Sequence, residues 1–292
     1  MRKIIAIGES VLDTLFRDGQ PVRSFVGGRI PCAAASLGSL GLPCYMVSEC
    51  TTDSVGDIII NYLTRHNVDV HSVDRYPDGA TAFSAIFETA EGKRIVNYGS
   101  YPKTRFDVVW PRIDEDDILL FGSLYSIDLP QRERLFELVK YAHERKAIIV
   151  YLPGFQHGIS FRITKVMPHL LENLEVSDLV IAHQSDIDTI FPNESAEEAY
   201  HNHIEFYCRN YLHIGNDLTV SMGGNGVSAK GEQSTNLLGW QAGFTAGIIR
   251  QFFDNDITHD GLRDLTPQQW SHILTQALTM AHQAAQSPDN CV

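Results

Sequence analysis

Short apolar runs alternate along the chain with longer stretches in which apolar residues recur every three or four positions. Runs of this kind are typical of buried strands, and the longer spacing is typical of helices that cover a sheet. The pattern predicts strands at residues 3–7, 44–47, 117–121, 147–151, 178–182 and 218–222. It predicts helices at residues 32–40, 56–66, 129–145 and 243–253. Strands that alternate with helices in this way favour a largely parallel sheet covered by helices.

Two segments break this alternation. Residues 13–26 are polar and turn-rich, with Asp18-Gly19 as a turn signal. Residues 81–88 and 94–99 flank Ala90-Glu91-Gly92-Lys93, which is typical of a β-hairpin. We expect these inserts, at about 13–26 and 81–99, to form a small β-lid over the cleft of one domain that spans residues 1–292. Lid strands with exposed edges favour pairing between two copies.

The charge balance and the cysteines limit the classes of partner and location. The formal net charge is −13 and the pI is about 5.3, which excludes nucleic acid and anionic membranes as main partners. No apolar stretch reaches the roughly 20 residues that span a bilayer. The five cysteines form no Cys-x-x-Cys pair and are odd in number, which favours a reducing, cytoplasmic location.

Candidate chemistry follows the first predicted strand. Asp13 closes the segment Gly8-Glu9-Ser10-Val11-Leu12-Asp13, and a carboxylate there can accept two hydroxyl donors of a polyol. The plainer alternative is a turn or capping aspartate. Gly27-Gly28 stands before the small-residue helix at 32–40, and paired glycines let the backbone approach a ligand closely. The alternative for this pair is a tight turn before a close-packed helix.

Two further segments lie in the same order as in a known family. Thr52-Asp53-Ser54-Val55-Gly56-Asp57 precedes a helix, and Ser221-Met222-Gly223-Gly224-Asn225-Gly226 ends a strand in a Gly-x-x-Gly turn. Together with the segments above, they resemble the ribokinase/PfkB carbohydrate kinases, and the fructokinase-like members in particular. The resemblance implies a ribokinase-like three-layer α/β/α domain with a mostly parallel sheet and a small β-lid. It also implies a homodimer through that lid.

The resemblance also assigns roles to individual positions. Sugar binding falls on Asp13, Gly27, Gly28 and Cys32, the last at the position of a family asparagine. Nucleotide binding falls, more weakly, on Ser221, Gly223, Gly226, Gly239 and Gly243. Asp186 stands where a family glutamate helps to organise magnesium and phosphate.

The departures from the family pattern concern phosphate handling. Gly-Ala-Gly-Asp, whose aspartate is the family base, reads Gly239-Trp240-Gln241-Ala242, so Ala242 occupies the base position without a proton acceptor. We expect Ala242 at the N-terminus of the 243–253 helix, facing the cleft, with Trp240 and Gln241 filling the space of a γ-phosphate. Asp-Pro-Asn reads Leu152-Pro153-Gly154, and Asn-x-x-Glu reads His183-Gln184-Ser185-Asp186.

Three hypotheses follow. The first is a sugar-binding pseudokinase with little or no phosphoryl transfer and no required cofactor. The second is an active ATP-dependent sugar kinase that uses Mg-ATP and an atypical base. The third is a structural dimer that binds no ligand. In the first two the partner is a small-molecule sugar.

Overall fold

The core of the fold is a ten-stranded central sheet. The structure is a computed structural model that describes residues 2–89, 92–127, 129–155 and 163–292. Its strands, in spatial order, are β14 (Ser228–Lys230), β13 (Thr219–Met222), β12 (Tyr211–Ile214), β11 (Leu179–His183), β10 (Ile148–Leu152), β9 (Ile118–Gly122), β1 (Ile4–Ile7), β4 (Cys44–Thr51) and β5 (Val68–Asp69), with β6 (Val73–Tyr76) also paired to β4. The pairs from β12 to β5 are parallel, and β13 and β14 add an antiparallel edge.

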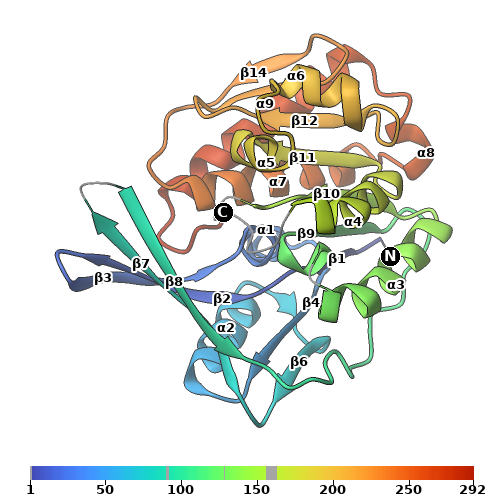
Figure 1. Ribbon diagram of the computed structural model, residues 1–292. Helices are drawn as coiled ribbons and strands as arrows, with labels where there is room; N and C mark the ends of the chain where they lie inside the picture. The colour runs from blue at the N-terminus through green and yellow to red at the C-terminus, as the bar shows by residue number, and fades with distance from the viewer. Residues whose placement is uncertain (1, 90–91, 128, 156–162) are drawn as a thin grey trace.

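Helices cover both faces of this sheet, as Figure 1 shows. One face packs against α1 (Arg29–Ser39), α2 (Ser54–Arg65), α7 (Leu237–Asp254), α8 (His259–Leu262) and α9 (Pro267–Gln286). The other packs against α3 (Leu129–Glu144), α4 (Ile163–Glu175), α5 (Gln184–Ile190), α6 (Ala196–Ala199), and the short helices η1 (Leu124–Ser126) and η2 (Tyr200–Ile204). β1, β9, β10, β11 and β12 are buried along their whole length, because strands covered on both faces need no polar side. The predicted parallel sheet is confirmed.

A second, four-stranded sheet extends from the body (Figure 1). Its order is β3 (Gln20–Gly27), β2 (Val11–Arg17), β7 (Ala80–Thr89) and β8 (Gly92–Ser100). Both predicted inserts therefore form strands of one sheet, called the lid below, and its action as a lid stays a prediction. Part of the expected turn at 90–93 lies outside the described residues. β2 and β7 pair in parallel, whereas β2–β3 and β7–β8 are antiparallel.

One carboxylate anchors the lid to the body. Asp53 caps α2, where its Oδ1 accepts hydrogen bonds from Gly56 N at 2.7 Å and from Thr81 Oγ1 at 2.7 Å, and its Oδ2 accepts one from Thr81 N at 2.9 Å. Burial opposes ionisation, but these donors outweigh it and lower the pKa of Asp53 to about 2. The predicted Asp-x-x-Gly segment is thus a helix cap that also positions β7.

Two helices begin earlier than the sequence pattern predicts. α1 begins at Arg29, because Gly28 at φ 93° supplies the N-cap and Pro31 stands in the first turn, where its missing N–H costs nothing. α7 begins at Leu237, so the predicted start at residue 243 is wrong. The side chain of Asn236 caps this helix by accepting a hydrogen bond from Gly239 N at 3.2 Å.

Small residues set the distance between α7 and α9. Gly239, Gly243 and Gly247 are spaced by four, so they share one face of α7. A Cβ on Gly243 would lie 2.5 Å from Cβ of Ala284, and one on Gly247 would lie 2.5 Å from Cα of Ala277. No side chain fits between these backbones, so the three glycines let the two helices pack closely.

The structure adds little to the expectations about location. None of the helices in the described ranges is long and apolar enough to cross a membrane. The cytoplasmic location inferred from the cysteines stays a prediction.

We expect Gly243→Ala to lower the free energy of unfolding by about 1–3 kcal/mol, because the added methyl collides with Ala284 and Met280. Alanine is the better helix former by about 1 kcal/mol, so propensity alone predicts the opposite sign. Urea unfolding measures the difference, and Gln283→Ala on the exposed face of α9 is the control. A Gly243→Ala protein as stable as wild type would contradict the close helix contact.

Candidate functional site

The predicted sugar residues Asp13, Gly27 and Gly28 meet where the lid joins α1. Asp13 on β2 pairs with Phe25 of β3 and Ser84 of β7, so it occupies the middle of the lid. Its carboxylate lies directly over Gly27, where any Cβ would collide with it. A Cβ on Gly28 would lie 2.8 Å from the Glu9 carbonyl oxygen. The glycine pair therefore admits the Asp13 carboxylate and the backbone after β1.

Asp13 holds its proton unusually well for an aspartate. Burial raises its pKa to about 7, and a hydrogen bond with Ser84 offsets only part of that effect. Near neutral pH the group is close to half-protonated, so it can both donate and accept hydrogen bonds to hydroxyl groups.

Cys32, the remaining predicted sugar residue, does not face the cleft. Its side chain is fully buried, and its Sγ donates to the Val26 carbonyl oxygen at 3.4 Å. A thiol in this orientation packs under the first turn of α1 and cannot touch a bound sugar without moving. The structure therefore brings together three of the four predicted sugar residues on one surface.

Asp186, the predicted metal residue, lies in a buried ion pair. Nη2 of Arg29 lies 3.4 Å from Oδ1 and 3.2 Å from Oδ2 of Asp186. Phe155 N donates to Oδ1 at 2.6 Å, and His183 N donates to Oδ2 at 2.9 Å in the capping box of α5. With both oxygens bonded and the side chain 0% exposed, Asp186 has no face open to a metal ion.

This carboxylate does not fit a divalent metal in the present structure. Among the described residues, no group of three His, Cys, Asp or Glu side chains could hold one. The residue that matters here, Arg29, was not singled out from the sequence. The sequence does contain an indication of its importance: Arg29 is a charged residue between Gly27-Gly28 and an otherwise apolar, small-residue helix.

The predicted nucleotide residues separate into two groups. Ser221, Gly223 and Gly226 lie together at the β13–β14 hairpin, where Gly226 adopts φ 69° and a Cβ on Gly223 would meet the ring of Tyr200 at 2.7 Å. Gly239 and Gly243 are instead buried in the contact of α7 with α9. Helix packing accounts for these two glycines without a nucleotide.

Ala242 lies inside a helix rather than at its start. It is the sixth residue of α7 and is 0% exposed, so the expected position at a helix N-terminus facing the cleft is wrong. Trp240 is likewise fully buried, stacked on Phe244 at 5.6 Å between ring centroids and packed against Gly231. Gln241 is buried as well. Trp240 thus packs in the hydrophobic core and does not occupy the position expected for a γ-phosphate.

Residues 287–292 contact the N-terminus of α7 through Asn290. Nδ2 of Asn236 donates to Oδ1 of Asn290 at 2.9 Å and to the Ala285 carbonyl oxygen at 3.2 Å. Asn290 is 1% exposed. The capping side chain of this helix end is therefore bonded to the C-terminal segment, while Leu237 at the first position of α7 is 42% exposed.

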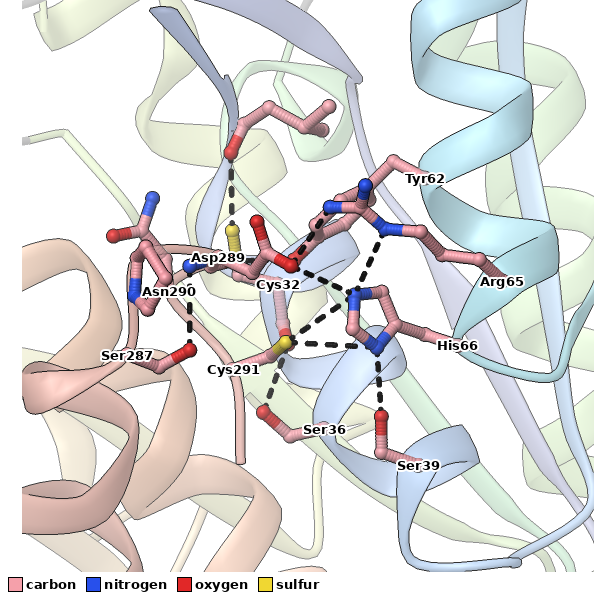
Figure 2. Close-up of polar contacts among 12 residues, drawn as sticks. Cys32, Ser36, Ser39, Tyr62, Arg65, His66, Ser287, Asp289, Asn290 and Cys291 are labelled. Atoms are coloured by element: carbon pink, nitrogen blue, oxygen red, sulfur yellow. Dashed lines mark hydrogen bonds and ion pairs between the residues drawn. The ribbon is translucent and has the colours of Figure 1, made fainter. Parts of the chain in front are cut away.

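The same segment reaches the lid and α2, as Figure 2 shows for its contacts with Tyr62 and Arg65. Arg23 of β3 donates to the Pro288 carbonyl oxygen and, at 3.2 Å, to Oδ1 of Asn290. The Tyr62 hydroxyl donates to the Asp289 carbonyl oxygen at 2.8 Å, and the Arg65 guanidinium pairs with the Asp289 carboxylate at 2.8 Å. One short segment thereby joins the lid, α2 and the cap of α7.

Comparison with known proteins decides the family. Residues 1–241 match the family model described as pfkB family carbohydrate kinase. The chain belongs to this family. The match ends inside α7, one residue before Ala242, so the base position and all of α9 lie beyond it.

Solved carbohydrate kinases share the fold. Fructokinase from Vibrio cholerae O395 is 14% identical, with 97% of this chain and 98% of that chain covered and a TM-score of 0.78. Aminoimidazole riboside kinase from Salmonella enterica, solved with aminoimidazole riboside and an ATP analog, is 12% identical, with 98% and 94% covered and a TM-score of 0.80. The predicted ribokinase-like α/β fold is confirmed.

One curated relative also matches. It is a sugar kinase from Pyrococcus horikoshii, described in its crystal structure as uncharacterized, and is 23% identical over 146 residues. The chain spans 47% of the length of that relative in this alignment. The pfkB family and the fold are thus established for this chain, whereas its substrate is not.

The raised pKa of Asp13 predicts a pH dependence of stability. Between pH 3.8 and about 7, folded Asp13 keeps a proton that the unfolded chain has lost, so Asp13 reduces stability as the pH rises through this window. We expect Asp13→Asn to match wild type at pH 4 and to be more stable at pH 8. Urea unfolding at both pH values measures this, with Asp18→Asn in the turn of the same hairpin as control. An equal difference at pH 4 and pH 8 would contradict the buried, protonated carboxyl group.

Proposed function

We propose that this pfkB family protein binds an uncharged sugar or polyol at Asp13, Gly27 and Gly28 and transfers no phosphoryl group. The observation that carries the proposal is the place of Ala242. By the motif resemblance it stands at the family base position; it is buried in the second turn of α7 and offers no proton acceptor.

Two further features support the loss of phosphoryl transfer. At the start of α7 the Asn236 side chain already bonds Gly239 N, Asn290 and the Ala285 carbonyl group, so the N–H of Gly239 is not free for a phosphate. Asp186 is paired with Arg29 and has no face for magnesium. Loss of a general base alone is worth about 10²–10⁴ in rate, whereas positioning and charge stabilisation carry most of the rest. All three contributions are altered here.

The second candidate function is an active sugar kinase with Mg-ATP. One observation favours it: a buried carboxyl group with a pKa of about 7 has the property that a general base needs, and Asp13 lies at the predicted sugar site. The solved relatives include a fructokinase with bound ATP from Xylella fastidiosa. In this alternative, Asp13 is the atypical base and the β13–β14 hairpin flanks the nucleotide.

Titration calorimetry with a panel of neutral hexoses, pentoses and polyols tests the proposed function. We expect at least one compound to bind wild-type protein without nucleotide. Asp13→Ala should weaken that binding about 10- to 150-fold, which corresponds to the roughly 1.5–3 kcal/mol of a hydrogen bond to a charged group. Asp18→Ala is the matched control, because Asp18 lies in the exposed turn of the same hairpin.

The same protein is then assayed for sugar-dependent ADP release with Mg-ATP. A rate near background is expected. A kcat of about 1–100 s⁻¹, ordinary for kinases, would establish the active enzyme instead. Absence of any sugar binding would leave the third hypothesis, a structural protein without a ligand.

We also propose that the lid mediates a homodimer. Its order leaves β3 and β8 as edge strands, and Tyr98 on β8 is 62% exposed. We expect a dimer by light scattering at tens of micromolar, and a shift toward monomer in Tyr98→Glu. Phe206→Glu, at an aromatic residue outside the lid that is 73% exposed, is the control. A wild-type monomer at these concentrations would count against the lid interface.

A further inference from the structure

A permanent cation lies beside the carboxylate at the ends of β10 and β11. Arg29, at the first position of α1, is 6% exposed, and its Nη2 pairs with both oxygens of Asp186. A Cβ on Gly154, just after β10, would lie 3.1 Å from the same Nη2. The guanidinium is therefore held between α1, the segment after β10 and the first turn of α5.

The surroundings of Arg29 are polar, and some of their hydrogen-bonding groups are unused. Glu9 follows β1, and its Oε1 accepts from Leu124 N at 3.4 Å. Its Oε2 has no hydrogen-bond partner among the described residues, and the same holds for Nε2 of His183, a residue 5% exposed. Ser123 after β9 is buried at φ 54°, a conformation that non-glycine residues rarely adopt.

The charges in this cluster favour one cation and leave no place for a second. Arg29 supplies the positive charge that pairs with the Asp186 carboxylate. Burial raises the pKa of Glu9, and the nearby Arg29 charge opposes that effect only in part. A guanidinium keeps its charge at every physiological pH and cannot leave by dissociation, unlike a bound metal ion. Mg²⁺ needs an accessible carboxylate and room for several waters, and Asp186 offers neither.

We propose that Arg29 permanently takes the place of a divalent metal ion at Asp186, so that the cleft binds its ligand without metal. Removal of the guanidinium should then uncover a carboxylate that binds Mg²⁺ or Mn²⁺. The inference deepens the proposed function, since it makes that binding metal-independent. The experiment that tests this inference measures metal binding. Its outcome is therefore independent of whether the protein binds a sugar.

The experiment measures thermal unfolding of three full-length proteins with and without Mg²⁺ or Mn²⁺. They are wild type, Arg29→Ser, and the double variant Arg29→Ser with Asp186→Asn. We expect no metal effect in wild type and a melting temperature of Arg29→Ser that rises by roughly 2 °C at about five times the metal Kd. The double variant has lost both charges and should not respond.

Each result is decisive. A metal-dependent rise in wild type would overturn the inference, as would an Arg29→Ser protein indifferent to both metals. Arg29→Ser leaves a buried carboxylate without its partner, so it is destabilised in any case. Should it fold only when metal is present, the inference is supported. Should it stay unfolded with metal while the double variant folds, metal cannot replace Arg29 and the inference is wrong.

As a second measurement, any sugar that binds wild type is titrated again in EDTA and in excess Mg²⁺. Equal affinities under both conditions are expected. A change of tenfold or more between them would contradict metal-independent binding, while leaving the sugar site itself intact.

Discussion

The close contact between α7 and α9 determines where α7 begins and which of its residues are buried. Because glycines at positions 239, 243 and 247 allow the two backbones to approach, α7 is stabilised by packing through its first turns. The helix therefore begins at Leu237. Ala242 becomes an interior residue, and the chain after α9 emerges beside Asn236. The burial of Ala242 and the contact of Asn236 with the C-terminal segment are thus two consequences of one packing arrangement.

Close approach of backbone also shapes the junction of the lid with α1, with a different result. Gly27 and Gly28 make room for the Asp13 carboxylate and the backbone after β1, so they bring a titratable group to the lid junction. The glycines at the α7–α9 contact let α9 pack directly against α7, which leaves no space for a ligand between the two helices. Glycine at the lid junction is instead filled by the Asp13 carboxyl group itself. The absence of a Cβ thus serves helix packing at one place and the position of a titratable group at the other.

The sequence pattern predicts the fold well, because a parallel sheet covered on both faces requires continuous apolar runs, such as β1 and β9. It misses β12, β14 and the early start of α7, since these depend on tertiary contacts rather than on local propensity. The proximity of Asp13 to the glycine pair was predictable, because these residues occur along the chain in the same order as the corresponding family motifs. Arg29 was not, because its importance arises only when folding brings it to Asp186, 157 positions away. The spacing of Gly239, Gly243 and Gly247 was visible in the sequence, and it indicates a helix contact as readily as a nucleotide turn.

The segment 287–292 has a consequence for how the molecule opens. Its bonds to Arg23 and Tyr62 join positions 265 and 227 residues apart along the chain. Contacts of such separation close late in folding, after the hairpin and helices they connect have formed locally. The β2–β3 hairpin, the α2 face and the cap of α7 should then behave as one cooperative unit in native-state hydrogen exchange. Any movement that lifts the lid must also loosen the first turn of α7, so access to the Asp13 surface and local unfolding of that helix end share one equilibrium.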